Sequence, residues 1–133
     1  MRSRDAEEED YLLRLIRQAA DVLRRLRHLM LSGAGSPEVI RLDAANAIEA
    51  LLGPQARILS RLDAMSAARL VGHPDHVALW GALLVVEADA TSSTGDSASA
   101  ARLHERARTL REAARVIWGT SGEVSDTSAR GAP

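Results

Sequence analysis

The sequence of 133 residues predicts an all-α protein of about five helices, arranged as antiparallel helical hairpins. Apolar residues recur at three- and four-residue spacing in several runs, which is the period of an amphipathic helix. Gly and Pro interrupt these runs, as expected of short connections between helices. The apolar fraction of 46% includes no Phe, one Tyr and two Trp, so the core is aliphatic and suits closely packed helices.

The first helix is expected from Asp5 to Leu31. Acidic residues occupy its first turns and basic residues its last turns, which complements the helix dipole. Its apolar stripe repeats at heptad spacing and is wide enough for an interface between two chains as well as for packing within one chain. The predicted interaction surface on this helix consists of Leu12, Leu15, Ile16, Ala19, Leu23, Leu26 and Met30.

Ser36 and Pro37 predict the start of a second helix, with Ser as the N-cap and Pro at the first helical position. This helix is expected to end at Leu52, because Gly53 and the Pro that follows it cannot continue the hydrogen-bond ladder. The segment 55–71 also has helical spacing. It is either one helix or two helices divided by Asp63 acting as an internal cap.

His73-Pro74-Asp75 predicts the start of another helix. Nearly every residue from Val77 to Val86 is apolar, so we expect this helix to be buried at the centre of the domain. A loop is expected from Thr91 to Gly95, followed by a last helix capped by Asp96 or Ser97 that ends near Gly119. The last helix carries a packing ladder of small and aliphatic residues, expected to lie against the preceding helix: Ala100, Leu103, Ala107, Leu110, Ala114 and Ile117.

Residues 1–119 are therefore expected to form a single helical domain. Residues 120–133 have the Ser, Gly and Thr content of a disordered tail.

Ala88, Gly95, Ala100 and Ala107 match the spacing of small residues in a tetratricopeptide repeat, and residues 100–108 resemble the second helix of that repeat. The resemblance implies a tetratricopeptide-like pair of helices at the C-terminal end.

A wider resemblance extends from Asp10 to Trp118. The opening segment 9–16, the Leu51-Leu52-Gly53 stop and the final hairpin together resemble an uncharacterised family of short bacterial helical proteins. This resemblance implies a fold and no reaction.

His73-Pro74-Asp75 is also the tripeptide that marks J-domain co-chaperones. A J-domain has a strongly basic helix before the tripeptide and an aromatic core, and this sequence has neither. The helix-boundary interpretation explains the same residues by capping. A small regulatory or co-chaperone-like factor that uses this corner is the alternative function.

A metal site at His73, Asp75 and His76 is a further hypothesis, because imidazole and carboxylate groups at this spacing can share one helical turn. Glu87 or His104 would supply the fourth ligand. The three residues fit solvated cap positions equally well and match no metalloprotease motif. We therefore expect no metal and no other cofactor.

The densest basic stretch lies on the polar face of the first helix, where solvated charges belong. No aromatic residues interleave with the arginines to stack on bases, Asp21 interrupts the stretch, and the formal net charge of the chain is −1. These features argue against nucleic acid as a partner. The stretch consists of Arg14, Arg17, Arg24, Arg25, Arg27 and His28.

The chain contains no Cys, which excludes disulfides and thiolate chemistry. The Gly-rich loop 33–37 lacks the Lys of a phosphate-binding loop, and no nucleophile motif is present, so we expect no enzyme activity. The longest apolar run is half a membrane span, and the N-terminus is too acidic for a signal peptide, which predicts a cytoplasmic protein without a membrane span. The expected function is non-enzymatic: interaction with a protein partner, or with a second copy as a homodimer.

Overall fold

The computed structural model describes residues 4–119, and every regular element in that range is helical. This confirms the all-α class. The elements are α1 (Arg4–Ser32), α2 (Pro37–Leu52), the 3-10 turn η1 (Gly53–Gln55), α3 (Ala56–Arg61), α4 (Ala64–Val71), α5 (Pro74–Ser93) and α6 (Ser97–Trp118).

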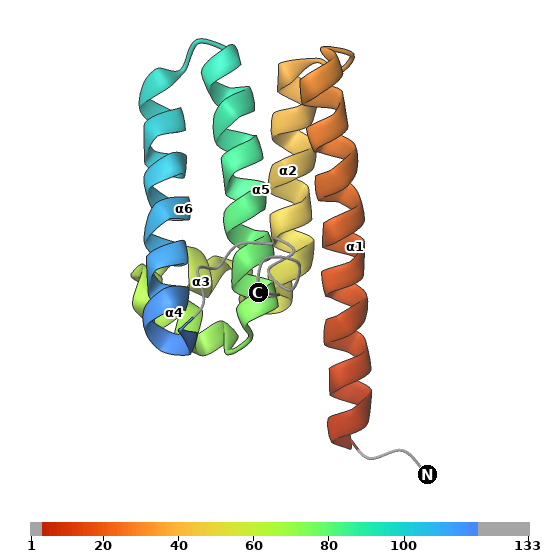
Figure 1. Cartoon of the computed structure of the whole chain (residues 1–133), viewed down its shortest axis with the longest axis vertical. Coiled ribbons are helices and arrows are strands. Elements are labelled where there is room, and N and C mark those ends of the chain that lie inside the picture. Colours follow the sequence, from red (N-terminus) through yellow and green to blue (C-terminus); the bar gives the residue numbers. More distant parts are fainter. Residues whose placement is uncertain (1–3, 120–133) are drawn as a thin grey trace, which may run out of the picture.

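The four long helices stand side by side in the order α6, α5, α2, α1, and each runs antiparallel to its neighbour (Figure 1). The short helices α3 and α4 lie across one end of this row. The expected count of about five helices holds when the segment between α2 and α5 is taken as one divided helix. The predicted disordered tail, 120–133, lies outside the described residues.

The helix boundaries follow the capping residues. The Ser36 hydroxyl accepts a hydrogen bond from the Val39 N–H at the start of α2 (3.4 Å). Gly53 ends α2 with a φ of 68°, and Gly119 ends α6 in the left-handed conformation with a φ of 70°. A side chain with a Cβ adopts such φ values only with strain, which is why Gly occupies these positions.

The segment 55–71 is divided, as one of the two alternatives predicts. Leu62 has an extended backbone, with φ −82° and ψ 153°, and ends α3. The Asp63 carboxylate then accepts a hydrogen bond from the Ser66 N–H (3.1 Å) and starts α4. The bonds to Ser66 lower the pKa of Asp63, so the cap carries a negative charge where the helix dipole favours one.

The loop expected from Thr91 to Gly95 is shorter than predicted, because α5 continues to Ser93. The Thr91 hydroxyl donates to the Glu87 carbonyl oxygen (2.7 Å), which satisfies this buried polar group inside the helix. Thr therefore does not interrupt α5. The last helix begins after Asp96, whose carboxylate accepts a hydrogen bond from the Ser99 N–H (3.0 Å).

α5 lies at the centre of the domain and contacts α6, α2, α1 and α4. Val77, Leu83 and most of the other apolar residues of its first three turns are buried, as the apolar run predicted. Its most extensive contact is with α6. Within the packing ladder on α6, Leu103 and Ile117 are partly buried against the core, and four residues are buried: Ala100, Ala107, Leu110 and Ala114.

Gly81 lies where α5 and α6 face each other. A Cβ added at this glycine would be 3.8 Å from the Ala107 carbonyl oxygen, which is an ordinary van der Waals contact. Gly81→Ala should therefore raise the free energy of unfolding by about 0.5–1 kcal/mol, because Ala loses less backbone entropy in a helix. Urea unfolding monitored by circular dichroism measures this change.

Gly72→Ala is the matched control, since Gly72 has a φ of 70° and ends α4. This change should lower the free energy of unfolding by about 1 kcal/mol. A Gly81→Ala variant less stable than the wild type would contradict the proposed fit between α5 and α6.

Candidate functional site

The structure covers most of the interaction surface predicted on α1. Ala19, Leu23 and Leu26 are buried, and Leu15, Ile16 and Met30 are partly buried against the core. The apolar stripe is wide because α1 packs against both α2 and α5. These six residues are therefore covered wholly or in part by the other helices, and within the predicted surface only Leu12 is exposed.

The first turns of α1 extend beyond the other helices (Figure 1). Asp5 and the stretch 7–14 are exposed, so within residues 4–119 the other helices give this part of α1 little cover. Tyr11 and Leu12 have 47% and 37% of their surface exposed. They directly precede the part of α1, from Leu15 onward, that the other helices begin to cover.

An apolar groove of about 280 Å³ lies beside Tyr11 and Leu12, and we call it the end groove. The end of α2, η1 and the last residues of α4 form its other walls. Leu70, at the end of α4, lines it with 49% of its surface exposed. A smaller apolar depression of about 180 Å³ continues along α1 and α2 and shares Leu15 and Leu51 with the end groove.

Sequence reasoning missed Tyr11 and Leu70 because neither lies on the heptad stripe or the packing ladder. A signal for Tyr11 was present. The run Tyr11-Leu12-Leu13 is apolar over more of the helix circumference than one packing face can cover, since successive residues are about 100° apart. No comparable signal marked Leu70.

His76 lies at the inner wall of the end groove with 5% of its surface exposed. Its Nε2 is 3.1 Å from the Leu51 carbonyl oxygen, so Nε2–H donates and links the start of α5 to the end of α2. Burial lowers the pKa of His76, and the bond to Leu51 only partly opposes this. The imidazole is therefore held in its neutral form, with a buried Nδ1 that has no hydrogen-bond partner within residues 4–119.

The His73-Pro74-Asp75 corner forms the boundary of α5. His73 has an extended backbone and precedes the helix, and Pro74 is its first residue. Asp75 is exposed in the first turn, where the helix dipole favours an acid. Over residues 4–119, no group of three or more His, Asp or Glu side chains is placed to hold a metal ion. His104 instead lies 3.1 Å from Asp89.

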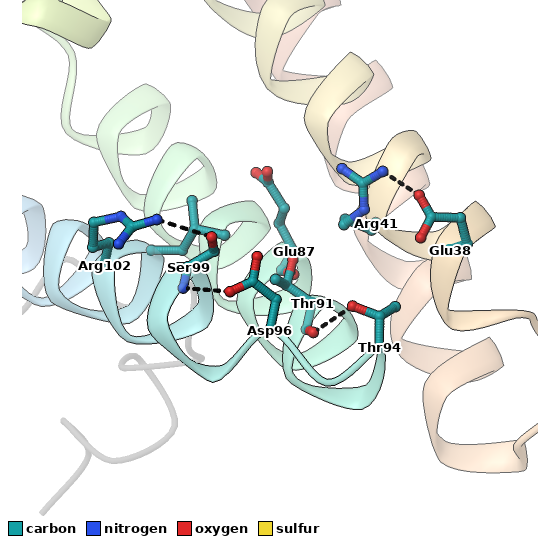
Figure 2. Close-up of a pocket in the computed structure, with 9 residues that line it drawn as sticks. Glu38, Arg41, Glu87, Thr91, Thr94, Asp96, Ser99 and Arg102 are labelled. Carbon is teal, nitrogen blue, oxygen red and sulfur yellow. Dashed lines mark hydrogen bonds and ion pairs between the residues drawn. The ribbon is translucent and has the colours of Figure 1, made fainter.

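A polar cavity of about 520 Å³ lies between α2, α5 and the start of α6 (Figure 2). Arg41 pairs with Glu38, and the Arg102 guanidinium donates to the Ser99 hydroxyl (2.9 Å). Glu87 is half-buried, and burial raises the pKa of its carboxyl group against the opposing charge of Arg41. Since both arginines of this cavity are already engaged within the protein, the end groove is the stronger candidate site.

No known protein family, curated protein or solved structure matches this chain. Among the helices of the described range, none is both long and apolar enough to cross a membrane.

The state of His76 makes stability depend on pH. Because its pKa in the folded protein lies below the unfolded value of about 6.5, the unfolded chain binds more protons between these two values. The free energy of unfolding is therefore fully retained above about pH 6.5 and falls as the pH drops below it. Urea unfolding at pH 7.5 and pH 5.5 measures the loss.

His76→Gln is the control, because the amide can donate to Leu51 and does not titrate. Glu87 contributes with the opposite sign in both proteins, so the difference between them isolates His76. Equal pH dependence of the two proteins would contradict this account of the buried imidazole.

Proposed function

We propose that the protein is a non-enzymatic helical interaction module that self-associates through the end groove. One observation supports this most directly. Tyr11, Leu12 and Leu70 are exposed large apolar side chains from two distant parts of the sequence, and all three line the same groove. Scattered apolar residues are normal on a protein surface, whereas an apolar group beside a groove is typical of an interaction site.

The chemistry of the groove supports the same proposal. Tyr is favoured in the centre of protein interfaces because it combines a large apolar ring with a polar hydroxyl. The Arg14 guanidinium lies 5.9 Å from the centre of the Tyr11 ring, which places a second residue type favoured at interfaces beside it.

The proposal also includes the compartment and the family of the protein. We propose that the protein is cytoplasmic and that it belongs to an uncharacterised family of short bacterial helical proteins, for which no reaction is implied. The mixed charge of α1 supports a protein partner rather than nucleic acid, whose phosphates require a consistently basic surface.

Self-association should appear as a concentration-dependent mass in light scattering or sedimentation. Leu70→Glu places a charge in the groove and should shift the protein to monomer, because an unpaired carboxylate resists desolvation. Val116→Glu is the control, since Val116 is 56% exposed on α6, outside the groove. A wild-type protein that stays strictly monomeric at high concentration would refute self-association.

The alternative proposal is a regulatory or co-chaperone-like factor that uses the His73-Pro74-Asp75 corner, where Asp75 is exposed. A double variant in which both His73 and Asp75 are changed to Ala separates the two proposals. The helix-boundary role predicts a loss of about 1 kcal/mol or less in the free energy of unfolding and unchanged self-association. The alternative predicts a folded variant that no longer stimulates an Hsp70 ATPase, and a wild type without stimulation excludes it.

A further inference from the structure

We infer that the end groove receives a second copy of this chain, and that the two α1 helices pair antiparallel about a two-fold axis beside Tyr11. This inference rests on the proposed self-association and adds its geometry. The end groove and the depression that continues it run along α1, so the apolar surface has the elongated shape that suits a helix.

The charges of α1 select the second copy as the occupant. Glu7, Tyr11 and Arg14 are spaced by four and three residues, so they lie on one side of the helix. The acid precedes Tyr11 by about one turn, and the arginine follows it by about one turn. All three side chains are exposed.

A two-fold axis beside Tyr11 places the Glu7 side chain of each copy opposite the Arg14 of the other. It also brings the two Tyr11 rings together next to the groove. A parallel pairing would instead set Glu7 against Glu7 and Arg14 against Arg14, which is repulsive. The antiparallel contact is isologous and closes on itself, so it yields a dimer rather than a filament.

The neighbouring charges of α1 follow the same order, with acidic residues before Tyr11 and basic residues after it. Between Asp5 and Asp10 the helix carries five acidic residues, and the next charged residues are Arg14 and Arg17. The dipole expected to explain these acids acts only within the first turn, and the last turn of α1 holds no basic residue. Glu8 and Glu9 lie beyond that turn, and Arg14 lies in the first half of α1, far from its C-terminal end, so the change of sign at Tyr11 exceeds what the dipole requires.

A charge-exchange experiment tests this pairing. Glu7→Arg and Arg14→Glu each create two like-charge contacts per dimer, so each variant alone should weaken dimerisation about tenfold at low salt. In an equimolar mixture, one chain of each type restores both opposite-charge contacts. The mixture should therefore dimerise with near wild-type affinity in sedimentation velocity.

Rescue by mixing also separates a pairing effect from a folding defect, because mixing does not repair a misfolded chain. Arg111→Glu, an exposed charge reversal on α6, is the control and should leave dimerisation unchanged. If the wild type dimerises and both variants dimerise equally well, the antiparallel pairing is overturned but self-association stands. The same conclusion follows if mixing the two variants fails to restore dimerisation. A monomeric wild type refutes both.

Disulfide trapping gives an independent readout, because the chain has no native Cys. A mixture of Glu7→Cys and Arg14→Cys proteins should form the mixed disulfide in preference to either symmetric one. Preferential Glu7→Cys homodimers would show parallel pairing and overturn the inference.

Discussion

The structure depends on the burial of α5. Its first three turns are apolar on nearly every side, so the helix is stable only when other helices surround it. The closest partner is α6, whose small residues allow the two backbones to approach near Gly81 and Ala107. The helices α2 and α1 cover its remaining faces and α4 also contacts it, so α5 contacts four other helices.

The end of the bundle is held by polar contacts to backbone carbonyl groups. The Arg106 side chain donates to the Leu59 carbonyl oxygen (2.9 Å) and lies 5.2 Å from the centre of the Trp80 ring. It thereby connects α3, α5 and α6. His76 makes the corresponding link between α5 and α2. Since α3 and α4 are short, they cover this end incompletely, and the end groove remains beside the protruding turns of α1.

The proposed function follows from this incomplete cover. The residues that stabilise α1 within the domain and those available to a partner belong to different parts of one helix. Leu23 and Leu26 contribute to the core, whereas Tyr11 lies where the bundle ends. An interface at such a boundary has apolar side chains at its centre and charged residues at its rim, which is the usual organisation of specific protein contacts.

The sequence by itself determined the helical class, the caps at Ser36 and Gly53, and the burial of α5, because each depends on local periodicity or on backbone conformation. Only the tertiary structure decided which part of the α1 stripe is covered and that α5 continues through Thr91. It also brought Leu70 and Tyr11, which are far apart in the chain, to the walls of one groove. The physical reason is that heptad spacing shows where an apolar face lies on a helix but not which neighbours cover it, or where that cover ends.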